Sequence, residues 1–172
     1  MPDREQNSAN FVRTPTVRVS TAEIQSAQLR KAFDLWTKLK GERPFPPRSE
    51  VSPRDMSEFL RNTVLVRVLD GGKEFQFRIV GDAIVLAQGQ SFQGLTTTEI
   101  DVRIPGYGSM IRAAYQRVHT EQKPLVLRGW YEHALSQRAF FHETMGLPLG
   151  PDAETVDHIL VVAIFAFGQD AA

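Results

Sequence analysis

The four histidines are the side chains of this sequence with the clearest capacity for chemistry, and their spacing tests whether they bind a metal. They are His119, His133, His142 and His158. No two stand four residues apart, the spacing that lets two imidazoles on one helix face share a metal ion, and the chain has no cysteine to complete a site. His142 and Glu143 are neighbours on an expected strand, where adjacent side chains point to opposite faces. We therefore expect surface or hydrogen-bonded histidines and no metal site.

Patterns of hydrolytic catalysis are missing from the sequence as well. A nucleophile elbow needs Gly-x-Ser-x-Gly directly after a strand, and Gly108-Ser109 lacks both the second glycine and the strand. Gly81 and Gly94 stand alone in expected loops rather than in a glycine-rich phosphate-binding loop. The carboxylates Glu154 and Asp157 lie in an expected turn, where solvation explains them. We expect no catalytic residue and no enzyme activity.

The charge balance and hydropathy of the chain restrict its partners. Lysine plus arginine and aspartate plus glutamate each number 20 in 172 residues, so the formal net charge is zero. Such a chain has no strong field for nucleic acid or an anionic membrane. The polar segment Met1 to Asn10 does not resemble a secretory signal. The longest apolar run, Ile159 to Phe167, is far shorter than the roughly 20 residues of a membrane span. We expect a soluble cytoplasmic protein that binds no nucleic acid.

The N-terminal third divides into an arm, a helix and a linker. Residues 1–19 lack a clear period and are expected to form a flexible arm, although Thr16 to Val19 has the composition of a short strand. Residues 20–47 are expected to contain a helix and a proline-rich linker. Ser20 and Glu23 form a capping-box pattern, and an apolar stripe at helical spacing follows. The stripe consists of Leu29, Ala32, Phe33, Trp36 and Leu39.

The remaining segment, residues 48–169, is expected to form the main domain. Ser52, Pro53 and Asp55 are typical of a short helix start. Two β-rich runs, Thr63 to Leu69 and Glu74 to Val80, flank a Gly-Gly turn and predict a hairpin, with Phe75, Phe77 and Ile79 on one face. A short helix ends at Gln88, residues 89–99 are loop-like, and a longer helix follows Pro105-Gly106 and stops at Lys123-Pro124.

The last third predicts three strands. They run from Leu125 to His133, from Arg138 to Leu149 and from Asp157 to Gly168. The last strand is apolar on both faces, so both faces must be covered. Helices from the middle of the chain cover one face, and the N-terminal helix is the natural cover for the other. The order of elements indicates an α+β fold with an antiparallel five-stranded sheet.

Four segments of the sequence resemble the PAS domain superfamily, closest to bacterial stand-alone proteins with a single PAS domain. The segments are Phe77 to Ile84, Gln93 to Leu95, Pro124 to Gly129 and Leu147 to Leu149. The resemblance extends in order from about Leu29 to Gly168. It implies strand order 2-1-5-4-3, helices on one sheet face, and a cavity of ligand size between them. It also implies sensing of a small molecule, with output through helices, dimer contacts or a signalling protein partner.

The same resemblance raises two cofactors, and the sequence favours neither. Some haem-binding PAS domains carry an axial histidine on the long helix, but His119 lies in the last turn, where the helix dipole and solvent stabilise it. Photosensors that form a flavin adduct need a cysteine, which this chain lacks. We expect no cofactor.

The expected cavity lining combines aromatic side chains with a few polar groups, as a ligand pocket does. The candidates are Phe75, Phe77, Phe92, Tyr107, Ile111, Tyr115, Tyr131, His142 and Thr144. The same stripes would also fill an ordinary core, and a register slip of one residue would move His142 to the other face. Arg128 and Trp130 are expected on the opposite face of the sheet.

The N-terminal helix is the candidate dimer interface. Its residues Leu29, Phe33 and Trp36 cover the second sheet face either within one chain or across a homodimer, and the sequence leaves both arrangements open. The leading functional hypothesis is a regulatory module that binds a small ligand or a protein partner. The alternatives are an interaction adaptor with a filled core and, third, an α+β enzyme with a small ligand.

Overall fold

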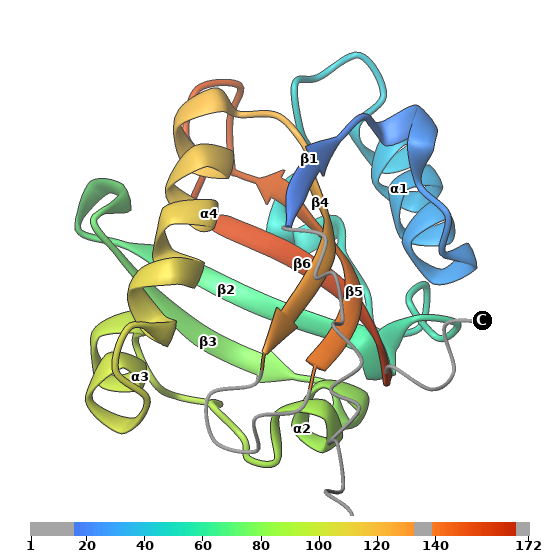
Figure 1. Cartoon of the computed structure of the whole chain (residues 1–172). Coiled ribbons are helices and arrows are strands. Elements are labelled where there is room, and N and C mark those ends of the chain that lie inside the picture. Colours follow the sequence, from blue (N-terminus) through green and yellow to red (C-terminus); the bar gives the residue numbers. More distant parts are fainter. Residues whose placement is uncertain (1–15, 133–138, 168–172) are drawn as a thin grey trace, which may run out of the picture.

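Six antiparallel strands form the centre of the fold, and helices lie on both of its faces (Figure 1). The structure is a computed structural model of the chain and describes residues 16–132 and 139–167. The strands are β1 (Val17–Val19), β2 (Thr63–Leu69), β3 (Glu74–Val80), β4 (Leu125–Glu132), β5 (Ala139–Leu149) and β6 (His158–Phe167). The helices are α1 (Ala27–Lys40), α2 (Asp82–Gln88), α3 (Thr97–Arg103) and α4 (Tyr107–Glu121). Short 3-10 turns are η1 (Thr21–Glu23), η2 (Arg48–Glu50), η3 (Leu60–Asn62) and η4 (Asp70–Gly72).

The sheet has the order β1-β4-β5-β6-β2-β3. The α+β class is confirmed, and β2 to β6 lie in the order that was predicted for five strands. The sheet differs from the prediction in its strand count, because β1 adds a sixth strand at the edge. Its residues pair with β4, with Arg18 opposite Leu127. The last residues of the expected N-terminal arm are therefore part of the sheet.

A β-bulge in the β2–β3 hairpin corrects the predicted face of Ile79. Leu65 pairs with Ile79, but Val66 pairs with Phe77, so the register shifts by one residue between them. The extra residue rotates the end of β3, as a bulge does. Phe75 and Phe77 face inward and are buried, whereas Ile79 is 38% exposed on the opposite side. The face that was predicted to hold all three residues therefore holds Phe75 and Phe77 but not Ile79.

Helix α4 crosses the inner face of the sheet, where it contacts β3, β4, β5 and β6. It begins after Gly106, whose φ of 86° is in the left-handed region that glycine adopts without strain. Helix α3 starts inside the segment that was predicted to be a loop. A capping box between Thr96 and Glu99 begins this helix. Residues 53–59, predicted to start a helix, form successive turns that still bury Met56 and Phe59.

Helix α1 covers the outer face over β5 and β6. Leu29 is fully buried and Trp36 is 4% exposed within this single chain, and Phe33 is half-buried beside them. The indole Nε1 of Trp36 donates to the carbonyl of Pro148 at 2.9 Å. Of the two arrangements left open by the sequence, the structure has the intramolecular one. Leu29 and Trp36 are therefore not exposed for a dimer contact.

The buried carboxylate of Glu143 fixes the start of α1 on the outer face. It accepts from the backbone amides of Ser26 at 2.8 Å and Gln25 at 3.1 Å, and the Arg128 guanidinium binds it at 2.7 Å. Burial would raise the pKa of this carboxyl, but the amides and the guanidinium outweigh it, so the pKa lies below its usual value. The predicted capping box of Ser20 and Glu23 is present, but it closes η1, and Ser26 caps α1.

The helices in the described part of the chain all lack the combination of length and apolar character that crossing a membrane requires.

Candidate functional site: a cavity beneath helix α4

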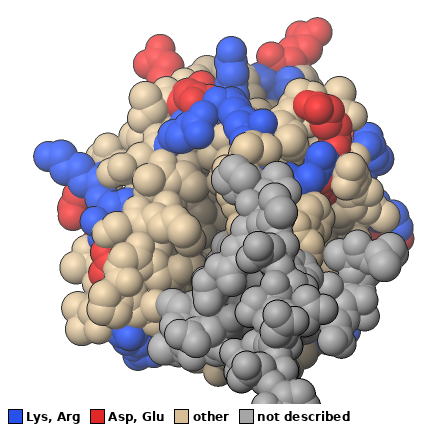
Figure 2. All heavy atoms as spheres, in the orientation of Figure 1, with Lys and Arg blue, Asp and Glu red and all other residues tan. Residues whose placement is uncertain are grey.

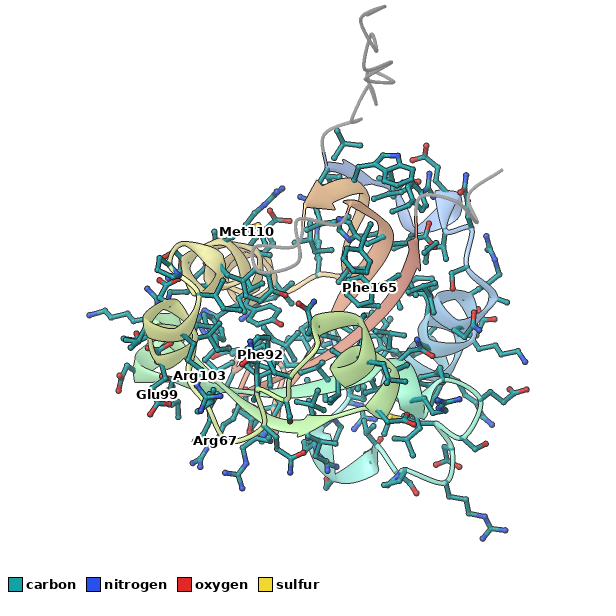
Figure 3. All side chains as sticks on the ribbon, turned by 60° about the horizontal axis from the view of Figure 1, so that its bottom comes forward. Arg67, Phe92, Glu99, Arg103, Met110 and Phe165 are labelled. Atoms are coloured by element: carbon teal, nitrogen blue, oxygen red, sulfur yellow. The ribbon has the colours of Figure 1, made fainter. Side chains whose placement is uncertain are left out.

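A cavity of about 230 Å³ lies between the inner sheet face and the helices α2 and α4. Its walls come from the five strands β2 to β6, both helices, the loop after α2 and Thr16, which precedes β1. They are formed by Thr16, Val64, Phe77, Ile84, Gln88, Phe92, Tyr107, Met110, Ile111, Ala114, Tyr115, Leu127, His142, Thr144, Val161, Ala163 and Phe165. Figure 3 shows Met110 of α4, Phe92 and Phe165 of β6 around this region, from three separate parts of the chain. The sheet and α4 therefore enclose space rather than packing fully against each other.

Seven of the nine predicted lining residues border the cavity. They are Phe77, Phe92, Tyr107, Ile111, Tyr115, His142 and Thr144. Phe75 does not border it, because it lies one pair further along the hairpin and is buried against Tyr115, with ring centroids 5.5 Å apart. Tyr131 lies on β4, but its side chain is outside the described part of the structure.

Aromatic rings form a continuous wall on the α4 side of the cavity. The ring of Tyr115 lies 6.1 Å from that of Phe77, which lies 6.2 Å from Phe92, and Phe92 lies 5.9 Å from Tyr107. Tilted and edge-to-face pairs at these distances are the favourable arrangements of aromatic rings. The wall is rigid and apolar, and it presents ring faces and edges to any occupant.

His142 is the main polar group on the sheet side of the cavity. In the register of β4 and β5 it lies opposite Gly129, which has no side chain, and beside Leu127 and Thr144 on the same face. Its Nε2 lies 2.9 Å from the hydroxyl of Thr16, and its Nδ1 lies 3.0 Å from that of Thr144. Burial lowers its pKa from 6.5 to about 4, so the imidazole is neutral at neutral pH.

The Tyr115 hydroxyl is the polar group of the cavity without a protein partner. Its side chain is 8% exposed and borders the cavity, and within the described residues it makes no hydrogen bond. Burial raises the pKa of this phenol, so it keeps its proton. A hydroxyl that faces a largely apolar cavity gains from an occupant that bonds to it.

Among the described residues, the cavity wall contains no lysine, arginine, aspartate or glutamate. Met110, which is 52% exposed, marks its opening toward the surface. Figure 2 shows charged side chains along the upper, left and right margins of this face, and mostly uncharged surface between the left margin and the grey atoms. An ion entering the cavity would lose its hydration without gaining a countercharge.

The histidine in the cavity makes stability depend on pH. Between pH 6.5 and about 4 the unfolded chain binds a proton at His142 that the folded chain does not. Stability is therefore complete above pH 6.5 and falls as the pH approaches 4, by about 3 kcal/mol for this shift. Urea unfolding at pH 7, 6, 5 and 4.5 measures this loss, and His142→Gln should flatten its slope. An unchanged slope in the variant would contradict the assignment.

The other histidines do not contribute to this site. His119 packs against Gly72, where a Cβ would lie 2.5 Å from its Nδ1, and His158 bonds to the adjacent Asp157 at 2.9 Å. His133 lies outside the described residues. No group of three or more metal-ligating side chains occurs within residues 16–132 and 139–167.

Sequence reasoning missed several lining residues. Thr16 was placed in the flexible arm, and only its place beside the three-residue strand β1 brings it to His142. Val64 and Ala163 lie on predicted strands, so the alternation of side chains along those strands was the available signal for them. Ile84 and Gln88 lie on α2, and their four-residue spacing was the available signal for a shared helix face.

A family model described as the PAS domain matches residues 24–164. No curated protein matches the chain significantly. Among solved structures, the PAS domain from Bordetella pertussis BvgS is 19% identical, with a TM-score of 0.48 over 64% of this chain and 80% of that one. An RNA-binding light-oxygen-voltage receptor is 12% identical, with a TM-score of 0.47 over 91% of this chain and 39% of that one. A Rhodobacter sphaeroides LOV protein is 15% identical, with a TM-score of 0.44 over 86% and 71%.

Proposed function

Because the chain belongs to the PAS domain family, we propose that it is a sensory module whose cavity beneath α4 binds a small uncharged organic molecule. The family supports a sensory or regulatory role. The ligand class follows from the described wall of the cavity, which is aromatic and aliphatic, carries no charged side chain, and offers a few neutral hydrogen-bonding groups. The module is proposed to work without catalysis and without a bound cofactor.

The size of the cavity narrows the ligand. Its volume of about 230 Å³ lies below the roughly 300 Å³ at which pockets for drug-sized ligands begin. A dry apolar cavity of about 150 Å³ accepts benzene. The proposed occupant is therefore a single substituted ring or a short aliphatic chain.

The observation that carries the proposal is the hydroxyl of Tyr115. It belongs to a buried side chain that lines the cavity, and it makes no hydrogen bond to the described residues. The imidazole of His142, in contrast, already has both of its nitrogens within hydrogen-bond distance of threonine hydroxyls. A ligand with one hydroxyl or carbonyl group would complete the hydrogen bonding of Tyr115 and place its apolar part against the aromatic wall.

Strand β5 is the proposed route of output, because adjacent residues on it face the two sides of the sheet. His142 borders the cavity, and Glu143 holds the first amides of α1 on the outer face. A ligand that shifts β5 would therefore change how firmly α1 is held. A signalling protein partner or a second copy of the chain would detect this change.

The homodimer remains a prediction, and we propose a second candidate contact for it. Since Leu29 and Trp36 are buried, the apolar surface still open on the outer face is a hollow of about 360 Å³ beside Leu65, Ile79 and Leu160. A cytoplasmic location and a bacterial source also remain predictions.

The enzyme alternative gains no support from the described part of the site. The described lining residues include no carboxylate, and both ring nitrogens of His142 lie beside threonine hydroxyls. The second candidate function is a ligand-free adaptor. A groove beside β1 favours this function, because it offers a surface for a partner protein.

Binding of simple aromatic probes tests the proposed ligand class. Isothermal titration of the purified chain with toluene, phenol and benzoate should show saturable binding of the first two, with benzoate at least tenfold weaker because its charge is desolvated without a partner. Tyr115→Phe should weaken phenol about tenfold, the cost of one hydrogen bond, and leave toluene unchanged. Absence of saturable binding of both neutral probes, or equal binding of benzoate, would overturn the proposal.

A further inference from the structure

A second hollow, on the outer side of the sheet, has a different chemistry from the cavity. It is an open groove of about 590 Å³ between β1 and the C-terminal half of α1, closed at one end by the residues that follow α4. We call it the β1 groove. Its lining consists of Arg18, Val19, Ser20, Thr21, Phe33, Trp36, Thr37, Lys40, Pro44, Gln122, Lys123 and Pro124. Figure 1 shows β1 and α1 next to each other at the top of the molecule, on the side away from α2 and α3.

The floor of the β1 groove is apolar. The rings of Phe33 and Trp36 stack with centroids 6.1 Å apart, and Val19 packs against the core beside them. Pro44 and Pro124, whose rings restrict the backbone, also line the groove. An apolar floor of this kind suits an apolar side chain of a partner better than it suits water.

One wall of the groove is the free edge of the sheet. Among the described strands, β1 is the last in the sheet order and pairs only with β4. Its residues are mostly exposed, with Val17 at 46%. An exposed edge presents backbone amides and carbonyls to which an extended segment can add as a further strand.

The charged groups of the groove are all cationic. They are Arg18, Lys40 and Lys123, and no carboxylate lines the groove. Arg18 is neutralised by Glu121, which it binds through two contacts of 3.1 and 2.7 Å. Lys40 lies 5.9 Å from the centroid of the Trp36 ring, and neither lysine has an ion pair among the described residues. The charge of Lys123 is therefore available for a partner. Lys40 donates to the carbonyls of Gly41 at 3.1 Å and Arg43 at 3.4 Å, and its charge has no carboxylate partner among the described residues.

We propose that the β1 groove docks an extended acidic segment of a partner protein. The segment would pair along the free edge of β1, place one apolar side chain against the half-buried ring of Phe33, and bring carboxylates to Lys40 and Lys123. This surface lies across the sheet from the cavity beneath α4, and the proposal does not depend on what that cavity binds.

Charge argues against a second copy of this chain as the occupant. Two β1 strands paired across a two-fold axis would bring the cationic rims of both grooves together, and like charges facing each other oppose pairing. An acidic segment complements the same rim.

Matched peptides test the docking proposal. The probes are two fluorescein-labelled peptides with the same Val-Phe-Val centre, one flanked by glutamates and the other by lysines. The acidic peptide should bind the full chain at least tenfold more tightly at low salt, and the difference should shrink as salt screens it. Amide shifts in an NMR titration should cluster at β1, η1 and residues 33–40. The variant Lys40→Glu/Lys123→Glu reverses the charge at these two positions, so it should bind the lysine-flanked peptide more tightly than the acidic one.

A net-charge control separates the groove from the overall charge. Lys31→Glu/Lys73→Glu makes the same charge change at exposed lysines outside the groove and should keep the acidic preference. Equal affinity for both peptides, no measurable binding of the acidic one, or shifts outside the groove would overturn the proposal. Self-association that sedimentation shows to be lost in Lys40→Glu/Lys123→Glu would also overturn it, because the occupant would then be a second copy.

Discussion

Replacing Glu143 with alanine is expected to lower the free energy of unfolding by about 3 kcal/mol, the cost of breaking a buried ion pair. The carboxylate is 4% exposed and receives three groups, the Arg128 guanidinium and the amides of Gln25 and Ser26. Its removal leaves Arg128 with the carbonyl of Glu23 but without a countercharge, and two backbone donors without their acceptor. All three groups lie where α1 begins, so the first turn of this helix should lose its attachment to the sheet.

Urea unfolding measures the global effect, and hydrogen exchange of the amides at the start of α1 measures the local one. Glu143→Gln separates the two contributions, because its amide oxygen still accepts from Gln25 and Ser26 while the charge is lost. Its expected destabilisation is smaller than that of alanine. Glu50→Ala is the matched control, since Glu50 also pairs with an arginine, Arg43, but at the exposed surface. An alanine effect at Glu143 as small as at Glu50 would refute the structural role of the carboxylate.

The parts of the site that the sequence predicted correctly are those with a strict local period. Alternation along a strand placed His142 and Thr144 on one face and Arg128 on the other, and the structure confirms these faces. The spacing of Ile111 and Tyr115 predicted a shared helix face in the same way. The apolar character of both faces of β6 predicted that a helix covers the outer one, and α1 does.

The parts that the sequence missed depend on departures from the period or on distant contacts. Ile79 was assigned to the inner face because alternation is exact in an unbroken strand, and one bulge residue reverses it. Glu143 was considered only as a metal ligand, since nothing local indicates that its partners are amides more than a hundred residues earlier. The capping box of Thr96 and Glu99 is local and was available in the sequence, but the surrounding glycines favoured a loop.

The segment from Thr16 to Ser26 connects these features across the edge of the sheet. Thr16 lies within hydrogen-bond distance of His142 on the inner face, β1 pairs with the edge of β4, and Ser26 is held by Glu143 on the outer face. Two adjacent residues of β5 thus hold both ends of one short segment. The β1 groove lies along the same segment, so occupancy of the cavity and of the groove would act on a shared element.

Filling the cavity in Ala163→Leu is expected to reduce the affinity for toluene at least tenfold. Ala163 lies on β6, opposite Thr144 in the register, and its methyl group borders the void. Leucine adds three carbon atoms to a space that the wild-type protein leaves open. Because these atoms replace void rather than protein, the free energy of unfolding should stay unchanged or rise by about 1 kcal/mol, as cavity-filling substitutions do.

Ala113→Leu is the control for this substitution, because Ala113 is an exposed residue of α4 outside the cavity lining. It should leave both toluene affinity and stability as they are. Titration with toluene and urea unfolding, applied to the wild type and both variants, distinguish an open cavity from a filled core. If Ala163→Leu instead destabilises the chain by more than about 1 kcal/mol, the space is already filled by protein, and the ligand-free adaptor becomes the better description. Undiminished toluene binding in Ala163→Leu would mean that the probe binds elsewhere. Loss of binding together with retained stability requires an empty space at Ala163, which a sensory cavity has and a filled core lacks.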